Sequence, residues 1–151
     1  MSNGFELPLR LLMAFRVLID ALHEELAAQG HSDMRPMHGF VLQAIARGAD
    51  SAAALGRTLG VSKQAAGKTI ETLEGLGYVT RVPDPADSRR KTVVLTDFGV
   101  DALRRSAEVF DELRSRWARE LGAERLDDLE ESLRQMTPGD LFRLDVPGWF
   151  G

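Results

Sequence analysis

The sequence contains no cysteine. This absence excludes disulfide bonds, thiolate metal sites, a nucleophilic thiol and thiol-based redox sensing. No apolar run approaches the ~20 residues that a membrane-spanning helix needs. The N-terminus has no basic segment ahead of its apolar stretch and no small-residue cleavage site, so it does not resemble a signal peptide. We therefore expect a cytoplasmic protein that does not enter a membrane.

Motifs of catalysis and metal binding are also absent. The sequence contains no HExxH, no phosphate-binding loop and no G-x-S-x-G. The three histidines, His23, His31 and His38, are scattered, and we expect them to be structural or solvated rather than catalytic. A regulatory zinc site at His23 and His38 with a carboxylate is an alternative, although zinc usually has three or four convergent ligands. We predict a non-enzymatic protein without metal or cofactor.

One part of the chain carries a net positive charge. The composition, 44% hydrophobic and 28% charged, is typical of a soluble globular protein, and 151 residues suffice for one domain or a compact module with additional helices. The net charge is −4, yet residues 57–95 carry seven cations against four anions, and both flanking segments are acidic. A polyanionic partner would contact this local basic region.

The N-terminal segment has the periodicity of an amphipathic helix over residues 5–29. Its apolar stripe consists of Leu11, Phe15, Leu18, Leu22 and Leu26, widened by Leu12 and Ile19. A stripe of this width suggests two packing partners, namely the remainder of its own domain and another subunit. A helix buried on two sides within a single chain is an equally good interpretation at this stage.

The next segment has the signals of three short helices. Pro36 lies in the first turn of a helix over residues 35–47, and Ser51 caps a helix that ends at Gly60. After one valine, Ser62 caps a third helix over residues 63–75. Two short helices joined by a Gly-Val-Ser turn are typical of a helix-turn-helix, but this pattern alone is a weak indication of DNA binding.

The helix over residues 63–75 has a polar outer face of mostly small side chains. Projection at 100° per residue places Gln64, Gly67, Lys68, Glu71 and Thr72 opposite the apolar stripe. Ser62 and Lys63 lie at the helix N-terminus, where free N–H groups favour a phosphate. Gln64 suits the N6/N7 edge of adenine, and Lys68 suits guanine or a phosphate. A solvated polar face is the alternative interpretation.

Residues 78–82 and 91–96 are rich in β-branched side chains and predict two strands. The loop between them, PDPADSRRK, has the Asp-Pro chemistry of a turn and three consecutive cations, Arg89, Arg90 and Lys91. Asp87 precedes Arg89 by two residues, so its carboxylate can hold the guanidinium. A solvated charged hairpin tip is the alternative.

Three segments together resemble the MarR-type family of bacterial transcriptional regulators. They are LGVSKQAA (59–66), LEGLGYV (73–79) and, most specifically, DPADSRRKTVVLTDFG (84–99). The resemblance implies a mainly α fold with a small β-hairpin wing, a winged helix-turn-helix with N- and C-terminal dimerisation helices. It implies a dimerisation helix in residues 1–34, a DNA-binding lobe in 35–96, and dimerisation helices and tail in 97–151.

The same resemblance implies a homodimeric repressor on a pseudo-palindromic operator in double-stranded DNA. The recognition helix would enter the major groove and the wing arginine the minor groove. Carried onto this sequence, the DNA contacts are Ser62, Lys63, Gln64, Gly67, Lys68, Arg89 and Arg90, with Asp87 supporting the wing. Gly67 departs from the larger or hydroxylated residue often found at its position, which affects base specificity there.

The C-terminal region is predicted to be helical. Thr96 caps a helix over residues 97–121, with Leu103, Phe110, Leu113, Trp117 and Leu121 on one stripe, and a last helix covers residues 124–136. In the family these helices interlock with the first helix of a second subunit. The apolar tail, residues 140–151, receives no role.

Many relatives bind small anionic phenolic compounds between the dimer helices and the DNA-binding lobe. The resemblance therefore implies a small anionic or aromatic effector near Arg16, Met37, His38 and Trp117. For each of these residues, packing within the core is the alternative. The alternative function for the whole chain is a winged-helix protein-interaction module without specific DNA binding.

Overall fold

The computed structural model describes residues 3–137 and 139. Within these residues the elements are α1 (Glu6–Ala28), α2 (Pro36–Ala46), α3 (Ala52–Leu59), α4 (Lys63–Gly75), β1 (Val79–Pro83), β2 (Lys91–Leu95), α5 (Asp97–Leu121) and α6 (Ala123–Met136). The mainly α winged-helix fold expected from the sequence is confirmed. No helix in the described ranges is long and apolar enough to cross a membrane. The tail at residues 140–151 lies outside the described residues.

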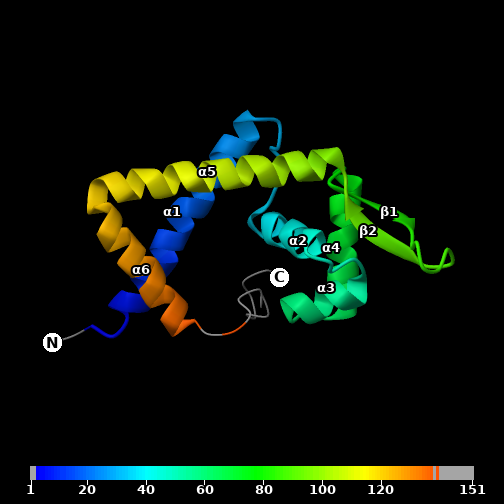
Figure 1. Ribbon diagram of the computed structural model, residues 1–151, viewed down its shortest axis with the longest axis horizontal. Helices are drawn as coiled ribbons and strands as arrows, with labels where there is room; N and C mark the ends of the chain where they lie inside the picture. Colours follow the sequence, from blue (N-terminus) through cyan, green and yellow to red (C-terminus); the bar gives the residue numbers. More distant parts are fainter. Residues whose placement is uncertain (1–2, 138, 140–151) are drawn as a thin grey trace.

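The elements gather at the two ends of α5 (Figure 1). At one end α2, α3, α4 and the antiparallel β1–β2 hairpin form what we call the winged lobe, residues 36–95. At the other end α6 folds back from α5, and Leu18 of α1 lines a cavity together with residues of α5 and α6. We call residues 5–17 together with α6 the helical end. The long helix α5 therefore runs from one part of the molecule to the other.

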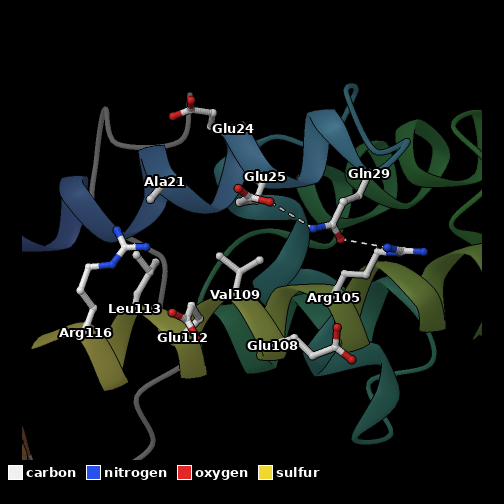
Figure 2. A pocket seen from close by; sticks show the side chains of 10 residues that line it. All are labelled: Ala21, Glu24, Glu25, Gln29, Arg105, Glu108, Val109, Glu112, Leu113 and Arg116. Carbon is white, nitrogen blue, oxygen red and sulfur yellow. Dashed lines mark hydrogen bonds between the residues drawn. The ribbon is translucent and has the colours of Figure 1, made fainter. Parts of the chain in front are cut away.

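α1 and α5 pack alongside each other near the middle of the molecule (Figure 2). The guanidinium of Arg105 donates a hydrogen bond to Oε1 of Gln29 at 2.9 Å, and the Gln29 amide donates to Glu25 at 3.2 Å. Beside these contacts, the two helices line an open cavity of about 390 Å³, and most of its lining residues are charged or polar.

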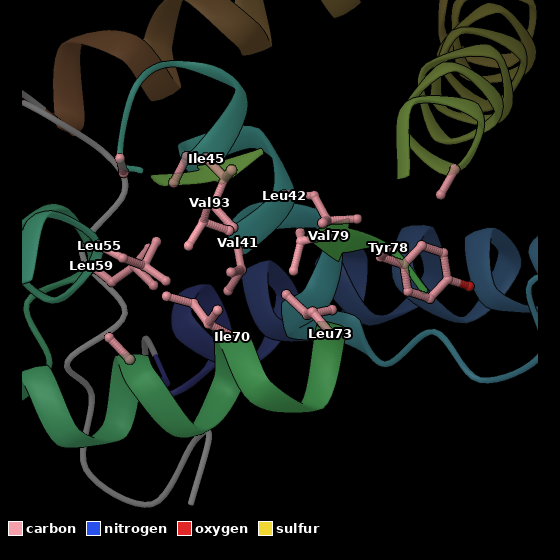
Figure 3. Packing of buried hydrophobic residues seen from close by; sticks show 14 of the residues in the cluster. Val41, Leu42, Ile45, Leu55, Leu59, Ile70, Leu73, Tyr78, Val79 and Val93 are labelled. Atoms are coloured by element: carbon pink, nitrogen blue, oxygen red, sulfur yellow. The ribbon is translucent and has the colours of Figure 1, made fainter. Parts of the chain in front are cut away.

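One continuous hydrophobic core fills the winged lobe (Figure 3). Its largest fully buried side chains are Tyr78, Leu26, Leu42, Leu55, Ile70, Leu73, Val41 and Val79. Full burial of one such aliphatic side chain contributes about 1.5–3 kcal/mol. The core extends past residues 35–96 on both sides, because Leu22 and Leu26 of α1 and Ala102 of α5 belong to it. The C-terminal half of α1 and the start of α5 are thus packed as parts of the lobe.

Three helix starts predicted from residue type have the expected cap. Ser51 accepts a hydrogen bond from the backbone N–H of Ala54 at 3.1 Å, and Ser62 accepts one from Ala65 at 3.0 Å. Thr96 accepts one from Gly99 at 3.1 Å. Each cap satisfies an N–H group that has no partner within its helix, and such a cap typically stabilises a helix by about 1 kcal/mol.

The helical end leaves much of its apolar surface exposed. In the predicted stripe of α1, Leu22 and Leu26 are buried, whereas Leu11 and Phe15 are 43% and 42% exposed. The large exposed apolar residues of this end are Phe5, Leu7, Leu9, Leu11, Leu12, Met13, Phe15, Val17, Leu129 and Met136. Burial of α1 on two sides within one chain is therefore wrong for its N-terminal half.

Candidate nucleic-acid interface

A tight turn sets the angle between α3 and α4. Gly60 ends α3 in the left-handed conformation, with φ of 73°, and the N–H of Val61 donates to the carbonyl of Gly56 at 3.0 Å. A Cβ atom added at Gly56 would lie 2.8 Å from the carbonyl oxygen of Val61. Glycine at both positions therefore allows the close approach that a helix-turn-helix requires.

α4 has one buried stripe and a largely exposed polar face. Ala66, Ile70 and Leu73 are at most 1% exposed and face the core. The side chains of Lys63, Gln64 and Lys68 are exposed, and neither lysine forms an ion pair with a described residue. The predicted N-terminal and outer-face residues other than Gly67 thus lie on one accessible surface.

Gly67 does not lie fully on that surface. It is half-buried, and a Cβ atom at this position would lie 3.7 Å from Cβ of Ala52 at the start of α3. The helical projection placed Gly67 on the outer face because it took no account of α3 packing there. The position lies at the edge between α3 and the exposed face, and its role in a DNA contact stays a prediction.

The wing is a hairpin with an ordered tip. β1 and β2 pair in an antiparallel register that runs from Val79 opposite Leu95 to Pro83 opposite Lys91. At the tip, Asp84 donates its N–H to the carbonyl of Arg90 at 2.8 Å and accepts one from Ala86 through its side chain at 2.8 Å. These bonds define the path of residues 84–90.

Arg89 is held by Asp87 while its side chain extends into solvent. Oδ1 of Asp87 accepts from the backbone N–H of Arg89 at 3.1 Å and from its Nε at 3.2 Å. The Arg89 side chain is 89% exposed. The side-chain hydrogen bond from Arg89 lowers the pKa of Asp87, with a further contribution from the backbone bond. The carboxylate therefore stays ionised at neutral pH and directs a guanidinium outward from the tip.

A further ion pair joins the wing to α4. Nε of Arg81 in β1 lies 3.6 Å from Oε1 of Glu74, near the end of α4. The charge of Arg81 is therefore paired within the chain, where it helps to orient the hairpin relative to α4. Two exposed cations, Arg57 of α3 and Lys91 of β2, were not assigned as DNA contacts from the sequence. For Lys91, the run of three cations at residues 89–91 is the feature of the sequence that could have identified it.

The residues predicted to surround an effector lie on three helices, α1, α2 and α5. Arg16 is exposed on α1 and pairs with Asp20 at 3.5 Å. His38 is buried in the first turn of α2, where Nδ1 accepts from the N–H of Arg35 at 3.1 Å and burial lowers its pKa. Met37 is half-buried beside it, and Trp117 lines a cavity of about 330 Å³ between α5 and α6. Their shared role stays a prediction.

The cavity between α1 and α5 contains none of these four residues (Figure 2). Its charged lining consists of Glu24, Glu25, Glu108, Glu112, Arg105 and Arg116. Four carboxylates against two guanidinium groups disfavour an anion there. Within the residues that the structure describes, no group of three or more His, Asp or Glu side chains could hold a metal ion.

The comparison with known proteins agrees with this geometry. The model of the MarR family matches residues 32–90, which span α2, α3, α4 and most of the wing. The structure of reduced MarR from E. coli has a TM-score of 0.69 at 24% identity, and the match covers 91% of this chain and 98% of MarR.

MepR from S. aureus is also similar. Its complex with ethidium bromide has a TM-score of 0.63 at 20% identity, covering 89% of this chain and 96% of MepR. A variant of MepR bound to an oligodeoxyribonucleotide has a TM-score of 0.60 at 18% identity, with the same coverage. No curated protein matches the sequence significantly. Residues 32–90 thus match the model of the MarR family, and the chain shares the winged helix-turn-helix fold of MarR and MepR.

Proposed function

We propose that the protein is a homodimeric repressor that binds a pseudo-palindromic operator in double-stranded DNA through α4 and the wing. The observation that carries this proposal is the location of the exposed cations. Lys63, Lys68, Arg89, Arg90 and Lys91 lie on α4 and the wing of a chain whose net charge is −4. A locally net-positive surface on an acidic chain is the expected footprint of a polyanionic partner.

The two parts of this surface suit different features of DNA. The exposed face of α4 presents a glutamine and two lysines, which match base edges and phosphates of the major groove. The N–H groups of its first turn favour a phosphate. Arg89 extends from the wing tip, as a side chain must to enter a narrow minor groove with enhanced negative potential.

The exposed apolar surface of the helical end supports a homodimer. Phe5 and Leu9, at 81% and 56% exposed, belong to an apolar hollow formed by the first turns of α1. A twofold dimer would bury this surface and place two recognition helices about 34 Å apart, one turn of DNA. Such spacing requires an operator with two related half-sites.

Release from DNA by a small molecule is the second part of the proposal. The ethidium complex of MepR is an example of small-molecule binding by a protein of this fold. In this chain the predicted effector site is the neighbourhood of Arg16, Met37, His38 and Trp117. An effector would act by binding more tightly to a dimer whose recognition helices have the wrong separation for the operator.

The test is a DNA-binding titration by fluorescence anisotropy, using the intergenic DNA upstream of the protein's own gene and a scrambled duplex. We expect preference for the upstream DNA and an affinity that falls steeply with salt. Arg89→Ala should weaken binding and reduce the magnitude of the salt slope by about 1. Arg116→Ala, which removes an exposed arginine from α5, is the matched control.

Two results would count against the proposal. Equal affinity for both duplexes would show that binding is not sequence-specific and would favour a protein-interaction module. If the Arg89 variant kept the affinity and salt slope of the unmodified protein, Arg89 at the wing tip would not contact DNA.

A further inference from the structure

Three segments that connect the winged lobe to the long helices meet around His31. His31 lies in the link between α1 and α2, Tyr78 lies directly before β1, and Asp101 lies in the second turn of α5. The His31 side chain is 1% exposed, although it carries two polar nitrogen atoms. A buried imidazole is costly unless both nitrogens have partners, so its surroundings indicate what it does.

Both ring nitrogens of His31 have partners from distant parts of the chain. Nδ1 lies 3.0 Å from the hydroxyl of Tyr78, and Nε2 lies 2.8 Å from Oδ2 of Asp101. Asp101 also accepts from Nε of Arg105 at 2.7 Å, and Arg105 in turn donates to Gln29 at 2.9 Å. We call His31, Tyr78, Asp101 and Arg105 the junction network. It joins the end of α1, the base of the wing and the start of α5.

The imidazole of His31 can keep the same two hydrogen-bond partners whether it is neutral or charged. Hydrogen bonds from His31, Arg105 and Arg104 hold the pKa of Asp101 well below its usual range, so Oδ2 is an acceptor for Nε2–H. With a neutral ring, the Tyr78 hydroxyl donates to Nδ1. With a charged ring, Nδ1–H donates to the hydroxyl oxygen. Both partners are retained in either state, as suits a permanent connection.

Packing and backbone contacts surround the same point. The ring of Phe98 lies 4.4 Å from that of His31 and 4.7 Å from that of Tyr78, measured between centroids. Thr96 donates its hydroxyl to the carbonyl of Gly77 at 2.6 Å and its N–H to that of Tyr78 at 3.1 Å. A Cβ at Gly99 would collide with the same Tyr78 carbonyl, so α5 starts directly against the base of the wing.

We propose that the junction network is a positioning device that makes the winged lobe and the first turns of α5 move as one body. His31 is its central positioning residue, because it is the one member that contacts both the wing base and α5 from the α1–α2 link. In the dimer of the proposed function, on which this consequence rests, the network would set the separation of the two recognition helices.

The first experiment measures the geometry within one chain, independently of DNA and of dimerisation. Because the sequence has no cysteine, Ser88→Cys at the wing and Glu120→Cys at the far end of α5 give two unique spin-label sites. Labelled protein is diluted with excess unlabelled protein, and the distance distribution is measured by pulsed electron paramagnetic resonance. We expect a narrow distribution that broadens when His31→Gln or Tyr78→Phe is added.

The control for this experiment is His23→Gln. His23 is a half-buried histidine whose one described hydrogen bond joins Nδ1 to the carbonyl of Ile19 in its own helix, at 2.8 Å. Its substitution should leave the distribution narrow. Tyr78→Phe keeps the ring packing and removes only the hydroxyl, so it tests the network if His31→Gln fails to fold.

The second experiment measures selectivity for half-site spacing. Operators with one base pair added or removed between half-sites are compared with the original by anisotropy. We expect the unmodified protein to prefer one spacing, and Tyr78→Phe to reduce that preference by a factor of roughly 2 to 30. Lower thermal stability alone would not change the ratio of affinities for two spacings.

The two proposals can fail separately. Absence of specific DNA binding by the unmodified protein would overturn the proposed function, while the intrachain distances would still test the network. Distributions as narrow in folded Tyr78→Phe and His31→Gln as in the unmodified protein would overturn the positioning role, even if the operator is bound.

Discussion

The winged lobe and the helical end differ in how completely one chain buries their apolar residues. In the lobe, Leu42, Leu55 and Ile70 are 0% exposed within a continuous core. At the helical end, Leu7, Leu9 and Met136 are 63%, 56% and 59% exposed. The same chain thus contains one region whose apolar residues are buried within the chain and another whose apolar surface is left exposed by the described residues.

This difference separates two kinds of stability. The lobe should depend mainly on its own packing, with little dependence on protein concentration. The helical end should gain its stability from association, which makes it concentration-dependent. An exposed apolar surface of this extent on a soluble domain typically marks an interaction site. Substitutions at each end test whether the two parts respond separately.

The largest effect is expected from a charge placed at the helical end. Leu12→Glu should give a monomer in sedimentation velocity, because an unpaired carboxylate is costly in an apolar interface. Loss of the second half-site contact should weaken operator binding by about 10²- to 10⁴-fold. Val100→Glu is the matched control, since Val100 is also exposed, at 54%, but lies on α5 beside the lobe. A Leu12→Glu dimer of normal affinity would place the interface elsewhere.

A cavity in the lobe core should produce the next largest effect. Ile70→Ala should lower the free energy of unfolding by about 2–5 kcal/mol, because the surrounding core fills the space only partly. Urea unfolding at one fixed protein concentration measures this loss. Thr69→Ala, at the neighbouring partly exposed position, should change the value by less than about 0.5 kcal/mol. Equal effects of the two substitutions would contradict the assigned packing of α4.

The smallest effect concerns the single tyrosine. Burial raises the pKa of Tyr78 to about 12, and the charge of Asp33 adds to this. The phenolate absorbance of the folded protein should therefore appear near pH 12, compared with about pH 10 in the unfolded chain. Since the folded pKa is the higher one, the resulting stability is complete below about pH 10 and is lost as the pH rises toward 12.

This titration has a clear readout because Tyr78 is the one tyrosine of the sequence. Urea-unfolded protein is the control. A midpoint near pH 10 in the folded protein would mean that the base of the wing is open to water, and would weaken the contrast between the lobe and the helical end.

Local features of the sequence predicted much of the fold. Ser51, Ser62 and Thr96 are good N-cap residues and start helices as predicted, because capping involves atoms within three residues of one another. The contact between Asp87 and Arg89 is likewise local, and the structure contains it. The predicted contact between Arg89 and DNA is not tested by the fold.

Features that depend on distant parts of the chain were not predicted. His31 is 47 residues from Tyr78 and 70 from Asp101, and no periodic pattern relates positions so far apart. The half-buried position of Gly67 depends on α3 in the same way. A hydrophobic stripe also indicates only that a surface is apolar, and the structure was needed to separate the buried part of α1 from the exposed part.

The length of α5 has a mechanical consequence. Its 25 residues correspond to about 37 Å, with the helical end at one terminus and the winged lobe at the other. A tilt of about 5° where two subunits pack would therefore displace the lobe by about 3 Å, close to the rise of one base pair along DNA. α5 can thus act as a lever arm, which converts a small change in helix packing into a one-base-pair error in operator register.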